Sequence, residues 1–165
     1  MYKRQVGVVD DHSEHGMGDV ERNKKAVLAM HDSVNRNDLD GMFDVMTEDI
    51  TFRAVGEHSL GGRIYQGKDD ITRHLFFEIF QRLEGGIEIS ISNLVADSET
   101  AFLHFMGKAT MKNGSLYHNE YVQTFRFRDG KISGVVEFMD SPLFAEVLEQ
   151  PTSIEGVDPD FRDAI

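Results

Sequence analysis

Cysteine is absent from this chain of 165 residues. Its absence excludes disulfide bonds, thiolate metal ligands and cysteine nucleophiles. It also gives no sign of an oxidising compartment, so we expect a cytoplasmic location. Long hydrophobic runs are missing too. No segment reaches the length that crosses a bilayer, and the apolar run Val6–Val9 is too short for the core of a signal peptide.

Basic residues are scarce relative to acidic ones. The 17 Lys and Arg residues stand against 29 Asp and Glu residues, which gives a formal net charge of −12 and an isoelectric point near 4.9. This negative charge repels phosphate backbones and anionic lipid headgroups, so we expect neither a nucleic-acid nor a membrane partner. The hydrophobic fraction of 40% is enough for one domain with a substantial core.

The hydrophobic periodicity changes once along the chain. Before Gly85 it is mainly helical, and after Gly86 it alternates as in strands joined by tight turns. The expected helices cover residues 20–34, 39–46, 68–83 and 142–150, and the expected strands cover residues 48–56, 87–95, 100–111, 115–127 and 131–140. This order predicts an α+β domain in which helices pack on one face of a curved antiparallel sheet.

The two ends of the chain differ from this domain in composition. Residues 1–19 are acidic and interrupted by glycine, and residues 151–165 are also acidic. We therefore expect a flexible acidic arm over 1–19, a single domain over 20–150 and an acidic tail over 151–165. His12 and His15 in the arm could hold a metal ion, but without a third ordered ligand we expect no metal site.

Three stretches carry a family resemblance: AMHDSVNRNDLDGMFDVMTEDITF, YQGKDDI and YHNEYVQTFRFRDGKISGVVEFMD. In this order they resemble the SnoaL-like and ketosteroid-isomerase-like branch of the nuclear transport factor 2 (NTF2-like) superfamily, over roughly residues 22–142. The resemblance implies a cone. In it a curved antiparallel sheet wraps around about three N-terminal and inter-strand helices, a short C-terminal helix follows, and a deep apolar pocket opens at the wide end.

The resemblance leaves the activity open. Members of this superfamily include isomerases, polyketide cyclases, dehydratases, epoxide hydrolases and proteins that only bind or dimerise. A fold of this kind does not determine chemistry, so the function has to be argued from the side chains of the site.

Asp140 is the first candidate for catalysis. It ends the last expected strand on the same side as Val136 and Phe138, the side that we expect to face the core. A carboxyl among apolar neighbours has its ionised form disfavoured and suits proton abstraction near neutral pH. The resemblance implies the same role, because an Asp at the matching place looks like the acid–base residue of SnoaL-type cyclases. Alternatively, Asp140 only caps the last helix.

His31, Gln123 and Asn119 are candidates for hydrogen bonding to a substrate. His31 falls on the apolar stripe of the first helix, and both amides alternate inward with Phe125. The resemblance implies that His31 and Gln123 occupy positions where ketosteroid isomerases hold donors to the enolate oxygen. His31 can instead be a hydrogen-bonded core residue, and the amides can instead satisfy backbone groups.

The expected wall of the pocket is mostly aromatic: Tyr117, Tyr121, Phe52, Phe102, Met106 and Phe138. One position departs from the isomerase pattern. The resemblance aligns the general base of ketosteroid isomerases with Ala54, which has no proton to exchange. Asp140 would have to take over that role.

The outer face of the sheet is expected to carry a dimer interface. His118 and Glu120 lie on the parity opposite to the amides, and Val122, Val135 and Met139 give this parity apolar content. Since this surface often makes the dimer in the superfamily, we expect a homodimer.

Three functions remain in competition. The first is an enzyme that moves a proton next to a carbonyl of a small apolar cyclic substrate, as an isomerase or aldol-type cyclase, without a cofactor. The second is a non-catalytic binder of an apolar metabolite. The third is an epoxide or halide hydrolase, which ranks last because Asn119, Tyr121 and Gln123 stand where its Asp and Arg residues would be sought.

Overall fold

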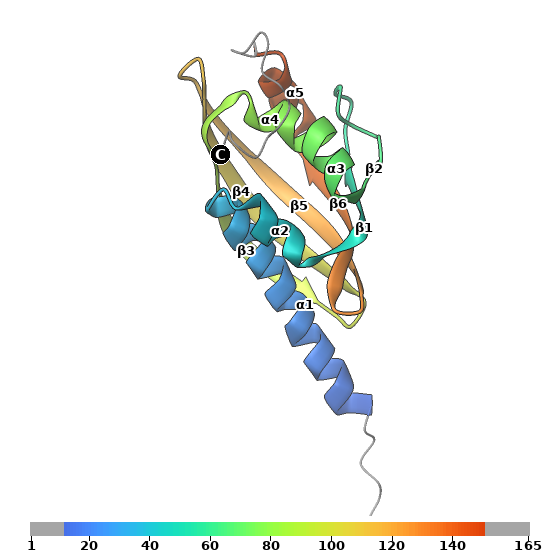
Figure 1. Ribbon diagram of the computed structural model, residues 1–165. Helices are drawn as coiled ribbons and strands as arrows, with labels where there is room; N and C mark the ends of the chain where they lie inside the picture. The colour runs from blue at the N-terminus through green and yellow to red at the C-terminus, as the bar shows by residue number, and fades with distance from the viewer. Residues whose placement is uncertain (1–11, 151–165) are drawn as a thin grey trace, which may run out of the picture.

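Six strands form one sheet against a set of helices in the computed structural model, which describes residues 12–150 (Figure 1). The helical elements are α1 (His12–Asn35), α2 (Leu39–Asp44), α3 (Gly67–Ile71), the π-helical turn η1 (Thr72–Phe76), α4 (Phe77–Phe80) and α5 (Ser141–Leu148). The strands are β1 (Met46–Ala54), β2 (Tyr65–Gln66), β3 (Leu83–Ala96), β4 (Thr100–Met111), β5 (Leu116–Arg128) and β6 (Lys131–Met139).

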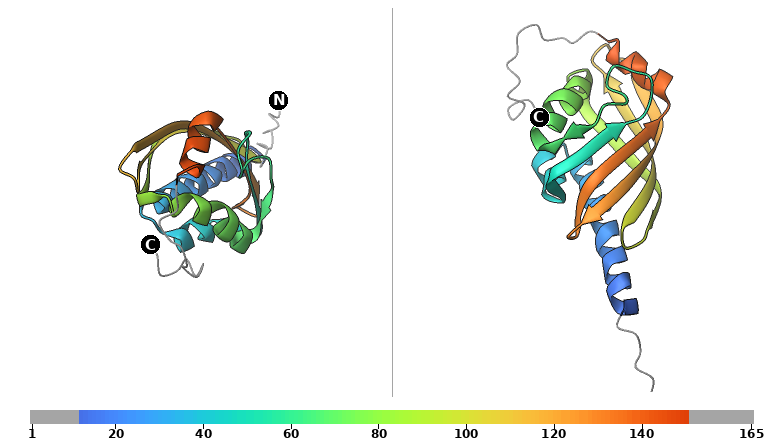
Figure 2. Two further views of the ribbon diagram at one scale, coloured as in Figure 1. Left: turned by 90° about the horizontal axis from the view of Figure 1, so that it is seen from above. Right: turned by 90° about the vertical axis from the view of Figure 1, so that its right-hand side faces the viewer.

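The sheet has the order β2-β1-β6-β5-β4-β3, and β1 and β6 are its parallel pair. The long strands β3 to β6 follow one another as antiparallel hairpins, which brings the end of the chain back beside β1. Seen from above in Figure 2, the sheet curves around α1, while α2 and the segment α3–α4 close the open side. The expected α+β class is therefore confirmed. In the described part of the chain, no helix is long and apolar enough to cross a membrane.

Helix α1 begins earlier than expected. It starts at His12, whereas the sequence pattern predicted an irregular arm up to residue 19. The glycines in this stretch each lower helix propensity by about 1 kcal/mol, but a helix that extends from a packed segment needs no new nucleus. The rest of the predicted arm and the whole predicted tail, residues 1–11 and 151–165, lie outside the described residues, as do the side chains of His12 and His15.

One continuous helical segment, Gly67–Phe80, replaces the helix expected over 68–83. Its middle is a π turn, in which the Phe77 N–H donates to the Thr72 carbonyl. A π turn inserts an extra residue into the helix, so two neighbouring residues can face the same side. The segment ends at Phe80, and Leu83 already belongs to β3.

Strand β6 contains a β-bulge. Phe127 pairs with Ile132 and Arg126 pairs with Gly134, so two steps along β6 match one step along β5. Ser133 is the additional residue. Because side chains alternate strictly along a strand, one extra residue reverses the face of every residue after it.

This reversal overturns the expected orientation of the second half of β6. Val135 is 2% exposed and Met139 packs against the core, whereas we expected both on the outer face. Phe138, expected in the pocket wall, is 44% exposed. Asp140 is also exposed. The acidic side chain that the bulge turns inward is Glu137.

Strand β4 also faces the opposite way to the expectation. Leu103 and Phe105 are almost fully buried, whereas Phe102 is 50% exposed and Met106 is half-buried on the same side as Phe102. The sequence of this strand is apolar on both faces, so alternation alone could not choose between them. Phe102 and Met106 therefore belong to the outer face.

Strand β5 agrees with its expected parity. Its inward row is buried from end to end and consists of Tyr117, Asn119, Tyr121, Gln123 and Phe125. Each of these side chains is less than 10% exposed. This row lines the concave face of the sheet, which the helices cover.

Asp140 begins helix α5 as its N-cap. Its carboxylate accepts a hydrogen bond from the Leu143 N–H at 3.4 Å, and Pro142 follows in the first turn. Its backbone is held by Asn119, whose side chain donates to the Asp140 carbonyl at 3.0 Å and accepts from the Asp140 N–H at 3.1 Å. The role of cap, which the sequence left open, is the one that these contacts describe.

Replacing the cap should cost stability. We expect Asp140→Ala to lower the free energy of unfolding by about 1 kcal/mol, because α5 loses a side-chain acceptor at its first turn. Asp140→Ser keeps an acceptor and should stay close to the wild type. Urea denaturation of the three proteins measures the difference. Equal stability of the Ala and Ser variants would contradict the capping role.

Candidate functional site

A cavity lies between the concave face of the sheet and the helices that cover it. Its lining is apolar apart from five side chains: His31, Tyr117, Tyr121, Gln123 and Glu137. Among the described residues that line it there is no Lys, Arg or Asp, and Glu137 brings the single carboxyl. A mostly apolar cavity with a few convergent polar groups is the usual form of a small-molecule site.

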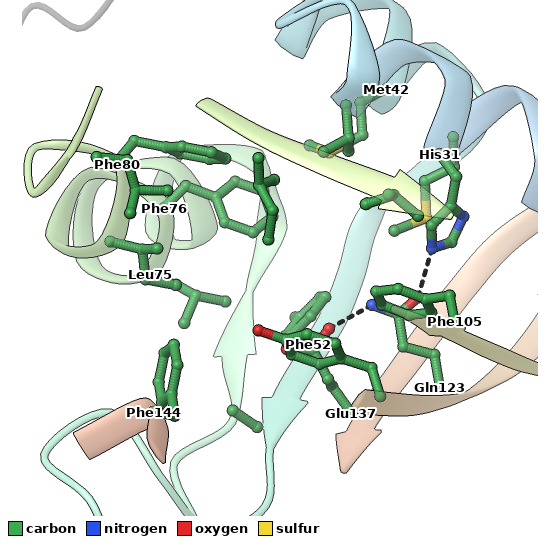
Figure 3. Close-up of a pocket in the computed structure, with 18 of the residues that line it drawn as sticks. His31, Met42, Phe52, Leu75, Phe76, Phe80, Phe105, Gln123, Glu137 and Phe144 are labelled. Carbon is green, nitrogen blue, oxygen red and sulfur yellow. Dashed lines mark hydrogen bonds between the residues drawn. The ribbon is translucent and has the colours of Figure 1, made fainter. Parts of the chain in front are cut away.

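The apolar wall is rich in aromatic rings. The segment α3–α4 contributes Phe76 and Phe80, whose ring centroids lie 5.9 Å apart, and Phe76 meets Phe52 of β1 edge to face at 6.0 Å. Phe144 of α5 and Phe105 of β4 complete the ring wall, as the close-up in Figure 3 shows. Such a surface suits a planar apolar ligand, because aromatic rings pack well edge to face or offset.

A row of three polar side chains crosses the cavity from α1 to β6. His31 Nδ1 donates to the Val27 carbonyl at 2.8 Å, and His31 Nε2 lies 2.9 Å from Gln123 Oε1. Gln123 Nε2 then donates to Glu137 Oε2 at 2.5 Å. Dashed lines in Figure 3 mark the two side-chain contacts of the row. Gln123 thus connects a base on a helix to an acid on a strand.

Burial moves both ends of the row toward their neutral forms. Glu137 is half-buried, and the partial loss of water around its carboxyl raises its pKa to about 7, although the hydrogen bond from Gln123 acts in the opposite direction. Burial lowers the pKa of His31, against the hydrogen bonds with Val27 and Gln123 and the charge of Asp32. A carboxyl with a pKa near 7 can both take and give a proton at physiological pH.

Strand pairing places Glu137 beside Ala54. Their Cα atoms are partners in the parallel pairing of β1 and β6, and both residues line the cavity. Ala54 is the position that the resemblance aligns with the general base of ketosteroid isomerases. The carboxyl in the described cavity lining therefore lies on the strand next to this position.

Two tyrosines form a second polar group in the cavity. The Tyr117 and Tyr121 hydroxyls lie 2.6 Å apart, and Asn119 Nδ2 donates to the Tyr117 hydroxyl at 2.9 Å. One of the two hydroxyl hydrogens serves their mutual bond, and the other has no acceptor among the described residues. Burial raises the pKa of both tyrosines, so they remain protonated donors. Tyr121 is held flat against Phe105, with ring centroids 4.8 Å apart.

The structure brings some of the expected site residues together and separates others. The cavity lining includes the expected residues His31, Gln123, Tyr117, Tyr121 and Phe52. The expected residues outside it are Asp140, Asn119, Phe102, Met106 and Phe138. Asn119 lies behind the tyrosines, where it orients Tyr117 and fixes the start of α5.

Sequence reasoning missed Glu137. A signal was present, because an isolated acid in the run VVEFM of an expected strand has apolar neighbours on both sides. The bulge at Ser133 concealed it, because strict alternation without a bulge assigns Glu137 to the outer face. Phe105 was missed for a related reason, since both faces of its strand are apolar.

The cone of sheet and helices, with its apolar cavity, defines a small-molecule pocket protein of the NTF2-like fold. The SnoaL-like domain family matches residues 27–135, about two-thirds of the chain, and the chain belongs to this family. Among curated proteins, none matches the chain.

Solved structures agree with this fold. An NTF2-like protein of unknown function from Burkholderia pseudomallei superposes with a TM-score of 0.69 at 16% identity, covering 78% of this chain and 98% of its own. TerC, co-crystallised with polyporic acid, superposes with a TM-score of 0.68 at 22% identity, and the match covers 78% of this chain and 99% of TerC. An LEH-like epoxide hydrolase from M. tuberculosis superposes with a TM-score of 0.62 at 18% identity, and the match covers 78% of this chain and 90% of the hydrolase. Likeness at these identities establishes the fold alone.

Glu137 should make the stability of the protein depend on pH in a defined direction. Its pKa rises from 4.5 in the unfolded chain to about 7 in the folded protein. Between these values the folded protein holds a proton that the unfolded chain has released, so stability from this group is present at low pH and lost as the pH rises through about 7. Relative to Glu137→Gln, the free energy of unfolding of the wild type should fall by roughly 3 kcal/mol between pH 4 and pH 8.

Urea denaturation of both proteins across this pH range measures the difference. Glu88→Gln, which removes an exposed carboxyl from β3, is the matched control for the loss of one charge. A constant difference between wild type and Glu137→Gln at all pH values would show that Glu137 ionises as readily in the folded protein as in the unfolded chain.

Proposed function

We propose that this protein is an enzyme that moves a proton next to a carbonyl group of an apolar cyclic substrate, without a cofactor, and that Glu137 is its acid–base residue. The observation that carries the proposal is the enclosure of one carboxyl, with a pKa of about 7, in an aromatic cavity. The acid–base role that the sequence suggested for Asp140 moves to Glu137, because Asp140 lies outside the cavity and caps α5.

The side chains of the cavity fit such a reaction. The Glu137 carboxylate would remove a proton from the carbon next to the carbonyl, and the electrons of that C–H bond would form an enolate. The available hydroxyl hydrogen of the Tyr117 and Tyr121 pair would donate to the enolate oxygen. Glu137 would then return its proton to another carbon in an isomerisation. In an aldol-type cyclisation the enolate carbon attacks a second carbonyl, and the proton goes to the new alkoxide.

The wall of the cavity favours a substrate built from rings. Phe52, Phe76, Phe80, Phe105 and Phe144 offer ring faces and edges, and few polar groups are available to hold a charged or highly hydroxylated molecule. The presence of polyporic acid with TerC supports a cavity of this fold that accepts organic ligands.

A non-catalytic binder is the second candidate. It is favoured by the pairing of Gln123, whose amide is hydrogen-bonded at both ends to other protein side chains. Epoxide hydrolysis has less support. It would use several charged groups, whereas the described lining holds one carboxyl and no Arg.

A homodimer through the outer face of the sheet is also proposed. On this face Phe102 pairs across strands with Val95, and Phe138 pairs with Val122. These four side chains are between 39% and 52% exposed, which is unusual for large apolar residues. A second copy of the sheet would bury them.

Deuterium incorporation from heavy water into a panel of cyclic and polycyclic ketones tests the proposed activity. We expect exchange with the wild type and a loss of about 10²-fold to 10⁴-fold with Glu137→Gln, which has the shape of the protonated acid but cannot accept a proton. Asp140→Asn keeps the cap of α5 and should exchange at the wild-type rate. Full activity of Glu137→Gln, or a loss confined to Asp140→Asn, would contradict the assignment.

Ligand-induced thermal stabilisation separates the enzyme from the binder. Ketones that raise the melting temperature of the wild type and of Glu137→Gln equally, while showing no exchange with either, would favour the binder. Exchange that depends on Glu137 favours the enzyme.

Sedimentation velocity tests the dimer. Phe102→Lys places a charge in the centre of the proposed interface and should convert a dimer to a monomer. Ile64→Lys changes another exposed apolar residue, in the loop before β2, and should leave the assembly unchanged. A monomeric wild type, or a Phe102→Lys dimer, would contradict the proposal.

A further inference from the structure

The row His31, Gln123, Glu137 contains a hydrogen-bonding constraint that fixes where its protons can lie. A carbonyl oxygen can only accept, so the contact with Val27 requires a proton on His31 Nδ1. If His31 is neutral, its Nε2 carries a lone pair and must accept a hydrogen bond from Gln123. If His31 is charged, Nε2 must donate to Gln123 instead.

The amide of Gln123 can satisfy either case by turning through 180°. With its oxygen toward His31 and its nitrogen toward Glu137, the row needs an imidazolium at one end and a carboxylate at the other. With the amide turned, the nitrogen donates to His31 Nε2, and the oxygen accepts from a Glu137 that must be protonated. Both arrangements hold the same number of protons.

Burial favours the neutral arrangement. His31 is 1% exposed and its ring meets Phe105 and Phe125 edge to face, so an imidazolium there would have little solvation. The nearest other titratable groups are the exposed Asp32 on α1 and the two tyrosines on β5. The cavity residues of β1, β3, β4, α4, α5 and η1 are apolar. The attraction between an imidazolium and a carboxylate on either side of an amide does not offset the free energy lost when both charges leave water.

We infer that Gln123 is a rotatable relay that couples the protonation of His31 to that of Glu137. In the neutral arrangement the amide donates to His31 and accepts from a protonated Glu137, whereas the orientation in Figure 3 is that of the charged arrangement. The two arrangements differ in three respects: in the charged one Glu137 has lost its O–H hydrogen, His31 Nε2 bears a hydrogen, and the amide is turned. No proton is lost to solvent, and Glu137 changes from a proton donor to a proton acceptor.

This inference deepens the proposed function, on which it rests for the acid–base role of Glu137. A buried carboxyl near neutral pH would normally become a base by releasing its proton to bulk water. Here a second acceptor for that proton lies at the far end of the same hydrogen-bonded row. His31 and Gln123 are therefore positioning residues, which act on a substrate through Glu137.

Nuclear magnetic resonance on the ligand-free protein tests the relay without any activity assay. Labelling with 15N-histidine reports which ring nitrogen of His31 carries the proton, and 13C-glutamate labelling reports the ionisation of Glu137. We expect His31 to be neutral at pH 6 with its proton on Nδ1. As Glu137 loses its proton, its carboxylate takes the Gln123 amide hydrogen that was donated to His31 Nε2, so the His31 nitrogen resonances should shift with the same inflection pH as the Glu137 carboxyl carbon.

Variants separate coupling from simple proximity. Gln123→Met removes both amide ends at nearly constant volume and should abolish the shared inflection. In Glu137→Gln the new amide donates to Gln123 at every pH, so His31 should stay in the Nδ1-protonated form throughout. Asp140→Asn is the matched control and should preserve the wild-type curves.

A proton on His31 Nε2 at pH 6, or a Glu137 titration that leaves the His31 resonances unchanged, would overturn the relay. Both readings come from the wild type and so do not depend on whether a variant folds. Deuterium exchange that depends on Glu137 would still stand if the relay failed, and an intact relay without exchange would leave a binder with coupled ionisation.

Discussion

Glu137 keeps its carboxyl inside the protein where the described cavity lining offers no cation, and its direct polar contact there is the amide of Gln123. An ionised carboxyl so placed loses most of its hydration without gaining an ion pair. The pKa of this carboxyl is therefore close to neutral, so that it can either hold or release a proton. The apolar wall, the curved sheet and the covering helices all contribute to this condition, because each of them excludes water.

The position of Glu137 depends on two features of the sheet. Parallel pairing of β6 with β1 sets it beside Ala54, which also lines the cavity. The bulge at Ser133 then turns it inward. The cavity thus receives its carboxyl from β6, on the strand beside Ala54.

The cavity has two polar groups with different properties. The tyrosine pair is anchored by Asn119, which is itself fixed by the backbone of Asp140, so its geometry is rigid and its hydroxyls remain protonated. The row from His31 to Glu137 can redistribute its protons. A fixed donor opposite an adjustable acid is a suitable arrangement for chemistry at a carbonyl, since one group holds the oxygen while the other handles the proton.

The α+β class, the inward row of β5 and the order of helices and strands other than the short β2 followed from the sequence alone. Local periodicity and turn residues encode these features. His31 and Gln123 could be named in advance because each interrupts an apolar face with a polar group. Glu137 could not, because a one-residue bulge is specified by pairing with β5 and leaves no clear trace in the alternation. The orientation of β4, the π turn and the N-cap contact of Asp140 likewise depend on tertiary structure, since each is fixed by which neighbour a side chain meets after the sheet has closed around the helices.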